Sequence, residues 1–413
     1  MQAADLGPVP DTEKTQSPVD LFLIFAGANI VATTLQTGAS LVPAFSLREA
    51  LLLVAGGTVL GSALVAALAP LGPRLGVPSV VACRAALGFR GAALVSLILY
   101  VTNFAWIAVN NVIAASALAR VLGGPASERL WAFSLGVLAT AIVAGGPRAV
   151  GHADRVAVPL LLVVGAILTL RCVRLPPGLL SAAGDGSMTA VRGFDVVAGY
   201  QVSWLLMFAD YPRYTRSKRK AAGAVFLGLA LTSLWFMPLG LACARAAGSA
   251  EPGGMLAAVG LGGLGALLLA VATLTTNFVN IYMSALAWKS LYPRAGDRVS
   301  VWSIGLVGAA LSFLPGWLRG YADFMLLLGG LLVPVGGVLL AHFFVLGRTP
   351  RVADLYAPDG PAARHGGFAL AGVCGWAAGT AAYFLAAPLG GTVPALTAAI
   401  LVTALLGRPR RQA

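Results

Sequence analysis

The feature that most constrains this chain is a succession of long apolar runs, separated by short gaps that hold Arg, Lys, Pro or Gly. The first run, LFLIFAGANIVATTLQTGASLVP at residues 21–43, contains no ionisable side chain. A helix needs about 20 apolar residues to cross a bilayer, and most of the runs approach or exceed that length. Only 10% of the residues are charged, whereas about 25% is usual for a soluble domain. The sequence therefore predicts an all-α integral membrane protein.

Splitting the chain at these gaps predicts about twelve membrane spans. They are expected near residues 20–44, 48–70, 91–119, 130–147, 156–173, 193–211, 222–247, 257–288, 300–317, 321–346, 367–387 and 392–407. With the N-terminus inside, the cytoplasmic segments hold 20 of the 28 Lys and Arg residues, which is the asymmetry typical of membrane proteins. We therefore expect a multi-pass protein of the cell inner (plasma) membrane, with cytoplasmic tails at 1–19 and 408–413.

The basic residues that give the chain its net charge of +13 lie in these short gaps, so the charge reflects orientation in the membrane and not nucleic-acid binding. The N-terminal segment is polar with mixed charge and has no signal-peptide pattern. The four cysteines are widely spaced, so their spacing predicts no disulfide framework and no metal site.

The polar side chains that enter the apolar runs are concentrated in four of them. All six asparagines lie within predicted spans: Asn29 in span one, Asn103, Asn110 and Asn111 in span three, and Asn277 and Asn280 in span eight. Gln36 and Gln201 add amides to spans one and six. Amides often join membrane helices through hydrogen bonds, but amides with that role alone should be spread over all twelve. Their concentration favours a binding site.

The spacing of these residues places them on shared helix faces. Asn103, Trp106 and Asn110 follow an i, i+3, i+7 pattern. Thr273, Asn277, Asn280 and Ser284 form a similar stripe. An indole beside amides suits a flat, polar solute, because the ring can stack on the indole while the amides hydrogen-bond to its edge.

Span one is predicted to be a broken helix, since it combines Gly27 and Gly38 with polar Asn29, Thr33 and Thr34. Unwound backbone at membrane depth must line a cavity or be buried in protein, and its carbonyl oxygens are suited to binding a cation. The hydroxyls of Thr275 and Thr276 in span eight could complete such a site.

The ionisable residues indicate which ion is coupled. The acidic residues nearest the spans, Glu49, Asp195, Asp210 and Asp323, all fall close to predicted span ends. A proton relay usually needs an intramembrane carboxylate, so its absence favours Na⁺, with H⁺ as the alternative. The three histidines, His152, His342 and His365, lie away from span centres, and no catalytic arrangement is evident, so an enzyme is not expected.

Several motifs resemble the nucleobase:cation symporter family, the purine/cytosine permeases, and most of all its bacterial cytosine permease-like members. They are GPVP at 7–10, TGASL at 37–41, ACRAALGFRG at 82–91, ADYPRYTRS at 209–217 and TTNFVNIYMSAL at 275–286. The resemblance implies a LeuT-type core of two inverted five-helix repeats, 20–173 and 193–346, plus two peripheral helices in 367–407. The polar-rich pairs, spans one and six and spans three and eight, would then be counterparts. The resemblance further implies cation symport by alternating access.

The resemblance also implies functional residues. Those expected to bind substrate are Trp106, Asn103, Asn110, Gln201, Ser203, Trp204, Asn277 and Asn280. The Na⁺ ligands would be the carbonyls of Gly27, Ile30 and Ala272 and the hydroxyls of Thr275 and Thr276. No other cofactor is expected, and the chain is expected to act as a monomer in the lipid bilayer.

The chain departs from the family at Gln201, where an aromatic residue is common. Tyr200 and Trp204 flank this position, so either one takes the aromatic role or the solute stacks on one side only. Besides cytosine, the open candidates are allantoin, hydantoin, purines and thiamine-precursor pyrimidines. A passive channel or facilitator, which would need no ion site, is the remaining alternative.

Overall fold

The structure, a computed structural model, describes residues 6–408 except 124, 293, 358–359 and 362–363. Within that part of the chain the regular structure is helical and no strand occurs, which confirms the all-α prediction. The predicted C-terminal tail lies outside the described residues beyond Arg408.

Each of the first five predicted spans contains at least one helix, in chain order: α1 (Pro18–Asn29) with α2 (Ala32–Ala39), α3 (Leu47–Leu68) with α4 (Leu71–Leu75), α6 (Arg84–Leu122), α7 (Pro125–Ala144) and α8 (Pro147–Cys172). The next five contain α10 (Ala190–Val202) with the turn η2 (Leu205–Met207), α11 (Lys218–Ala247), α13 (Gly262–Leu291), α14 (Asp297–Leu311) and α15 (Tyr321–Leu340) with the π-helical turn η4 (Ala341–Val345). The last two contain α17 (Leu370–Leu385) and α18 (Thr392–Gly407).

Short elements connect these helices: η1 (Asp11–Glu13), α5 (Ser79–Ala82), α9 (Pro177–Leu180), η3 (Pro212–Tyr214), α12 (Pro252–Ala258), η5 (Val352–Leu355), α16 (Arg364–Gly367) and η7 (Ala387–Leu389). In the described residues, seven helices are long and apolar enough to cross a membrane, or eight if the bent pair α1–α2 counts as one span. Helices α8, α10, α14 and α18 stand at the four other predicted spans, so the structure is compatible with twelve.

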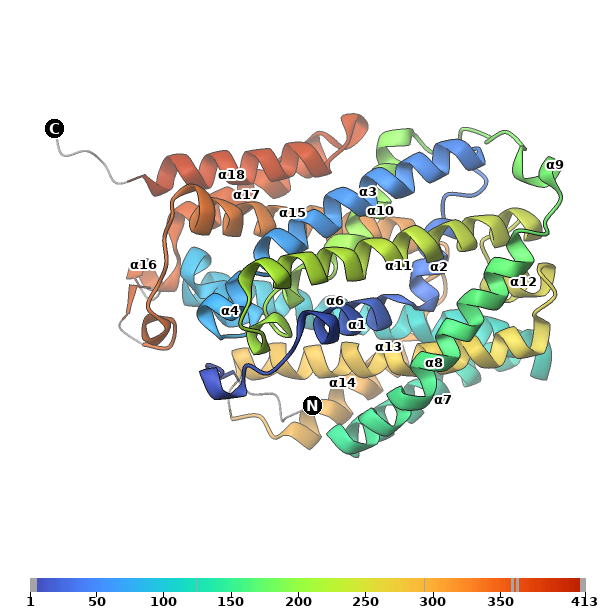
Figure 1. The fold of residues 1–413 in the computed structure, drawn as a ribbon, viewed down its shortest axis with the longest axis horizontal. Helices are drawn as coiled ribbons and strands as arrows, with labels where there is room; N and C mark the ends of the chain where they lie inside the picture. Colours follow the sequence, from blue (N-terminus) through green and yellow to red (C-terminus); the bar gives the residue numbers. More distant parts are fainter. Residues whose placement is uncertain (1–5, 124, 293, 358–359, 362–363, 409–413) are drawn as a thin grey trace.

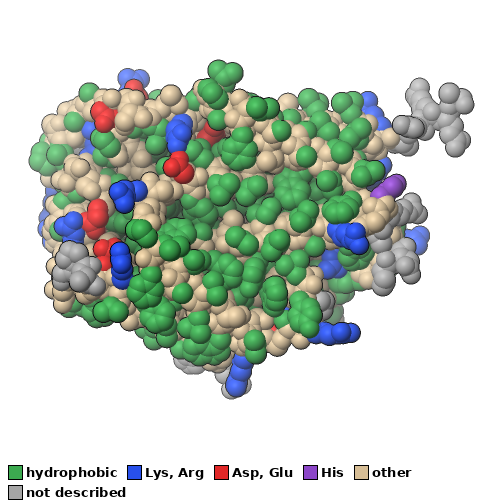
Figure 2. All heavy atoms as spheres, turned by 180° about the vertical axis from the view of Figure 1, so that it is seen from behind, with side chains coloured by type: hydrophobic (Ala, Val, Ile, Leu, Met, Phe, Trp, Pro, Cys, Tyr) green, Lys and Arg blue, Asp and Glu red, His purple; other side chains and the backbone are tan. Residues whose placement is uncertain are grey.

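The long helices run along the longest axis of the molecule (Figure 1). Figure 2 shows a face on which hydrophobic side chains fill the middle, whereas most charged side chains lie toward the two ends of that axis. Leu52, Leu130 and Leu405 are among many large apolar side chains that remain exposed. An exposed apolar belt between charged ends is what a lipid bilayer requires.

Local sequence signals fix where the first helices begin. The Ser17 hydroxyl accepts a hydrogen bond from the backbone N–H of Asp20, whose carboxylate accepts one from the N–H of Ser17. Ser46 and Glu49 repeat this reciprocal arrangement at the start of α3. Each capping box satisfies backbone donors that a helix N-terminus would otherwise leave unpaired.

Glycines allow some helices to approach at backbone distance. A Cβ atom on Gly38 of α2 would lie 1.9 Å from the carbonyl oxygen of Met237 in α11, and one on Gly240 would lie 1.9 Å from that of Leu35. Gly199 brings α10 equally close to α15, because its Cβ would lie 2.1 Å from the oxygen of Met325. Helices α2 and α10 are therefore held by direct backbone packing, as is common between membrane helices.

The two C-terminal helices pack against α15, and one of them is also fixed to α10. The Asp195 carboxylate, on α10, accepts hydrogen bonds from the backbone N–H groups of Gly391 (2.6 Å) and Thr392 (3.1 Å) at the start of α18. A carboxylate at a helix N-terminus is favourably placed, because the backbone N–H groups there are unpaired and the helix dipole is positive. Asp195 thus attaches a peripheral helix to the core.

Candidate functional site

The first span breaks between α1 and α2, as the sequence predicts. The two helices meet at 58°, and the backbone at Ile30 and Val31 leaves the helical region. Asn29, at the end of α1, points its amide nitrogen at α11, where it lies 2.8 Å from Thr232 Oγ1 and 2.7 Å from Ser233 Oγ. The break is thus fixed by side-chain hydrogen bonds to a neighbouring helix, and the Asn29 carbonyl at the end of α1 accepts a hydrogen bond from the Thr34 hydroxyl at 2.6 Å.

A second break follows α10, which ends at Val202. The chain continues through Ser203 and Trp204 into the turn η2, and the Ser203 hydroxyl donates to the Tyr200 carbonyl at 2.7 Å. This interruption was not predicted, because the segment contains no Pro and no Gly after Gly199. The Tyr200 hydroxyl lies 2.5 Å from Thr34 Oγ1 and 3.2 Å from Asn29 Oδ1. It therefore connects the two breaks directly.

A cavity of about 50 Å³ lies where the two breaks meet α6 and α13. It is lined by residues from four spans: Ala28, Val31 and Thr33; Leu99, Asn103 and Trp106; Tyr200, Ser203, Trp204 and Met207; and Thr276, Val279, Asn280 and Met283. Sites for drug-sized ligands usually occupy about 300–1,000 Å³, so this cavity is much smaller than such a site.

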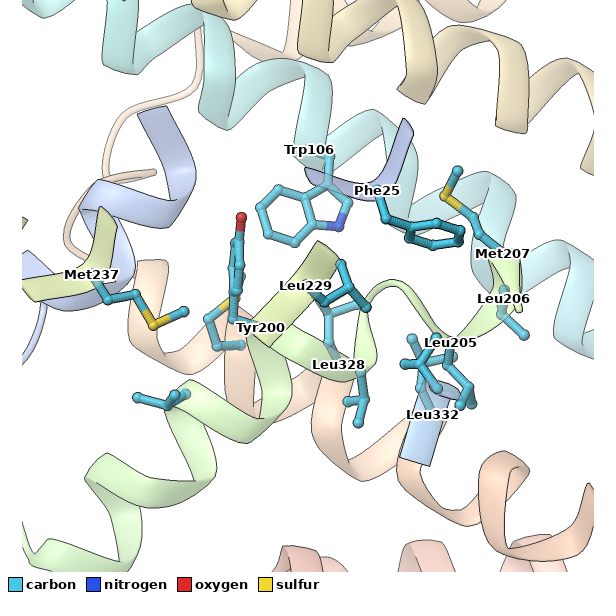
Figure 3. Packing of buried hydrophobic residues seen from close by; sticks show 14 of the residues in the cluster. Phe25, Trp106, Tyr200, Leu205, Leu206, Met207, Leu229, Met237, Leu328 and Leu332 are labelled. Atoms are coloured by element: carbon cyan, nitrogen blue, oxygen red, sulfur yellow. The ribbon is translucent and has the colours of Figure 1, made fainter. Parts of the chain in front are cut away.

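Aromatic rings form much of the wall. The indole of Trp106 meets Tyr200, Tyr321 and Phe324 edge to face, at centroid distances of 6.1, 6.5 and 5.1 Å. Figure 3 shows the rings of Trp106 and Tyr200 side by side, with Phe25 and Met207 near them. Trp204 packs edge to face on Phe25 at 6.5 Å. These edge-to-face contacts hold the rings in place beside the cavity.

Two hydrogen-bond donors in this wall have no partner among the described residues. They are the amide nitrogen of Asn103, a side chain that is only 4% exposed, and the indole nitrogen of Trp204. A buried donor without a partner costs about 1–3 kcal/mol, so it is seldom retained without a reason. Both atoms belong to residues that line the cavity, so a ligand with in-plane acceptor atoms would satisfy them.

The structure brings five of the eight predicted substrate-binding residues to the cavity, together with one predicted cation ligand, and leaves the other three substrate-binding residues outside its lining. Those at the cavity are Asn103, Trp106, Ser203, Trp204, Asn280 and Thr276. Those outside are Asn110, Gln201 and Asn277. The Gln201 amide nitrogen instead donates to Ser233 Oγ at 2.6 Å, and the Cβ atom of Gln201 packs against Gly61 of α3. Tyr200 and Trp204, the two aromatic neighbours of Gln201, both line the cavity.

Three asparagines outside the lining, Asn110, Asn111 and Asn277, form a cluster of hydrogen bonds between α6, α13 and the end of α14. Asn277 donates to Asn111 Oδ1 at 2.8 Å and accepts from Asn110 at 3.3 Å. Asn111 in turn donates to Ser312 Oγ at 3.1 Å. Asn280 lies at the edge of this amide cluster and donates to Asn277 at 3.4 Å. Asn110, Asn111 and Asn277 are fully buried, so these three join helices.

The predicted cation ligands come from α1 and α13, which are in contact. Gly27 lies in the last turn of α1, and Ile30 follows its end, where carbonyl groups lack helical partners. Thr276 lines the cavity, with Thr275 beside it on α13. Ala272 lies one turn earlier, and its side chain falls outside the described residues.

The four acidic residues near the spans all have structural partners away from the cavity. Asp195 caps α18, Glu49 caps α3, and Asp210 accepts hydrogen bonds from the backbone and hydroxyl of Ser79. Asp323 forms a 2.5 Å ion pair with Arg192. None of the residues described as lining the cavity is a carboxylate.

Comparison with known proteins places this arrangement in context. A family described as permease for cytosine/purines, uracil, thiamine, allantoin matches residues 8–406. The cytosine permease of Escherichia coli strain K12 is 24% identical over 352 residues, which cover 82% of this chain and 80% of that permease.

Solved structures share the fold. The nucleobase-cation-symport-1 family transporter Mhp1, in a closed conformation with bromovinylhydantoin bound, gives a TM-score of 0.83 at 21% identity over 98% of this chain and 94% of its own. Its inward-facing conformation gives 0.84 at 20% identity, over 97% and 92%. A Na⁺-coupled sialic acid symporter gives 0.60 at 14% identity, over 97% and 95%.

The chain thus has the LeuT-type fold that the sequence predicts, with a small cavity between two broken spans. The match over nearly the whole chain shows that it belongs to the purine/cytosine permeases, the nucleobase:cation symporter family, as its motifs predict. Because this is a family of permeases, the protein is a transporter and not an enzyme.

Proposed function

We propose that the protein imports a nucleobase or a closely related small heterocycle, with cytosine as the first candidate, by Na⁺ symport with alternating access. The main observation in support of this proposal is the pair of hydrogen-bond donors without a partner among the described residues, Asn103 Nδ2 and Trp204 Nε1. They belong to the same cavity wall as the aromatic rings of Trp106 and Tyr200. Nucleobases are flat and carry carbonyl oxygens and ring nitrogens at their edges. They therefore offer stacking surface and acceptors to the same wall.

The same features limit the choice of substrate. A site built around hydrogen-bond donors rejects analogues that lack the matching acceptor far more strongly than an apolar pocket does. Allantoin, hydantoins, purines and thiamine-precursor pyrimidines also present in-plane acceptors, so they form the panel against which cytosine should be compared. The cavity volume of about 50 Å³ favours the single-ring members of that panel.

Sodium is the ion we propose for coupling. Backbone carbonyls at the end of α1 and the hydroxyls of Thr275 and Thr276 are hard oxygen ligands, which suit Na⁺. Proton coupling would call for a titratable group near the substrate, whereas Asp195, Glu49 and Asp323 are engaged in caps and an ion pair elsewhere. The ligands of the cation would be Gly27, Ile30, Ala272, Thr275 and Thr276.

We also propose an orientation in the membrane, which follows from the charge distribution. The excess of basic residues in alternate loops supports cytoplasmic termini, and we assign the protein to the inner (plasma) membrane. A site enclosed by the helices of one chain requires no second copy, so a monomer is sufficient for transport.

The test is uptake of radiolabelled cytosine by purified protein in lipid vesicles. An inward Na⁺ gradient should drive accumulation, and replacement of Na⁺ by choline should abolish it. Thr276→Ala should weaken the Na⁺ dependence strongly, because it removes one ion ligand, whereas Thr397→Ala on the exposed face of α18 should not.

Uptake that persists in choline and follows an imposed pH gradient would show that the coupling ion is H⁺ and not Na⁺. Flux that equilibrates without accumulation under either gradient would indicate a facilitator. Competition by the unlabelled heterocycles in the same vesicles then ranks the substrates independently of the ion.

A further inference from the structure

Helices α8 and α11 pack along a specific interface. Trp235 on α11 donates from its indole nitrogen to the Thr169 hydroxyl of α8 at 2.9 Å. One turn earlier on α8, Gly165 leaves room for the rings of Trp235 and Phe236, which would lie 2.9 Å from an added Cβ. The two helices are therefore held in a defined register.

The same interface ends in two cysteines. Cys172 is the last residue of α8, and Cys243 lies four residues before the end of α11. Their sulfur atoms are 3.6 Å apart, and the side chains are 7% and 2% exposed. Sulfur atoms in van der Waals contact need only a small side-chain rotation to reach the bond length of about 2.05 Å in a disulfide. Their separation of 71 positions in the sequence gives no hint of this contact.

Both cysteines lie at the same end of the molecule. Figure 1 shows α8 and α11 ending near α9 and α12, at the end opposite to α16 and the C-terminal end of α18. In the orientation proposed above, that end faces the outside of the cell. Disulfides form and persist in extracellular and periplasmic environments, whereas the cytosol keeps thiols reduced.

We propose that Cys172 and Cys243 are a thiol-oxidation site, at which a disulfide forms and links α8 to α11. The two thiols lose two protons and two electrons to a small oxidant, such as a copper–phenanthroline complex with oxygen, and one S–S bond forms. Reduction by a dithiol reverses the step. The oxidant reaches the pair from the end of α8, where Val173, the residue after Cys172, is exposed.

The bond would join two parts of the transporter that are separate in the sequence. Helix α8 belongs to the predicted first repeat, and α11 belongs to the second and holds the broken span α1–α2 through Gly38 and Gly240. A covalent link between them restricts any motion of one relative to the other. Oxidation should therefore stop transport, and this consequence, unlike the bond itself, rests on the proposed function.

The chemical test uses the full-length Cys374→Ser protein in lipid vesicles, because Cys374 is the exposed cysteine and could link two chains. The vesicles are treated with copper–phenanthroline, then denatured and alkylated with N-ethylmaleimide. We expect alkylation of Cys83 alone, with mass spectrometry detecting a peptide pair joined through Cys172 and Cys243. Alkylation of all three remaining thiols, or a disulfide that involves Cys83, would overturn the proposal.

The functional test compares cytosine uptake before and after oxidation. The Cys374→Ser protein should lose uptake on oxidation and regain it with dithiothreitol, whereas the same protein with Cys172→Ser should be unaffected. A disulfide that forms without loss of uptake would retain the oxidation site but overturn its effect on transport. If no uptake is detectable at all, detection of the peptide pair joined through Cys172 and Cys243 still tests whether the disulfide forms.

Discussion

Two regions of α6 that lie within two turns of each other use amides in opposite ways. Asn103 belongs to the cavity lining, and its amide nitrogen has no partner among the described residues. At Asn110 and Asn111 the amides belong to the amide cluster, in which they bond to Asn277 and Ser312. The cluster satisfies most of its donors within the protein, whereas the cavity leaves donors for a ligand. The residue type is the same, so the availability of a protein partner separates an amide that joins helices from one that binds solute.

The largest expected effect is that of Trp106→Ala on substrate affinity. Removing the indole deletes the ring on which the solute stacks, and central aromatic residues of binding sites contribute at least about 2 kcal/mol, or roughly 30-fold in Kd. Cytosine binding by isothermal calorimetry measures the change. Leu97→Ala on the lipid-facing side of α6, where the side chain is 44% exposed, is the matched control. Equal affinity in the two variants would show that the cavity is not the substrate site.

The next effect, that of Asn111→Ala, concerns stability. The substitution removes the acceptor of the Asn277 amide and the donor to the Ser312 hydroxyl, which should lower the free energy of unfolding by about 1–2 kcal/mol. Thermal unfolding of the purified protein measures this. The Kd for cytosine should stay unchanged once the folded fraction is accounted for. A weakened Kd with normal stability would place the amide cluster in the substrate site.

The reverse result is expected for Asn103→Ala. Because the lost donor has no protein partner, thermal stability should stay close to that of the unaltered protein. The Kd for cytosine should rise by about tenfold, which corresponds to roughly 1.4 kcal/mol for the amide. Measuring both quantities for the Asn103 and Asn111 variants tests the contrast between the two regions directly. A drop in stability without any change in Kd would contradict it.

The smallest effect is expected for Trp204→Phe. A phenyl ring preserves most of the packing on Phe25 and removes only the indole donor, so the loss should be about 0.5–1 kcal/mol, or roughly threefold in Kd. The loss should be greatest for ligands with the most in-plane acceptors. If affinity falls equally for all members of the heterocycle panel, Trp204 acts through packing alone.

Much of the fold was predictable because the bilayer leaves few solutions for an apolar chain. Helix positions, the all-α class and the break in span one follow from apolar length and from Gly and polar residues around Asn29. The break after Val202 was not predictable, because Gln201 to Leu205 reads as ordinary helix. That interruption depends on contacts made by tertiary packing, such as the Ser203 hydroxyl with the Tyr200 carbonyl.

The helices that form the candidate site were predictable from the sequence, whereas only some of the residues that line the cavity were. Helical spacing places Asn103, Trp106 and Asn110 on one face, but it does not say how far along that face the cavity extends. Asn110 lies one turn past Trp106 and donates to the carbonyl of that residue. Gln201 and Tyr200 are adjacent and so point in different directions, and only the structure shows that Tyr200 is the one that lines the cavity.

The cap that Asp195 provides has a consequence for the C-terminal helices. Asp195 lies on α10, which ends in the cavity wall, and its charge-assisted hydrogen bonds to Gly391 and Thr392 are of the stronger kind. Any tilt of α10 must carry the start of α18 with it or break those bonds. A chain shortened before Gly391 would therefore lose more than a lipid-facing helix, because it would leave the buried Asp195 carboxylate without these two donors.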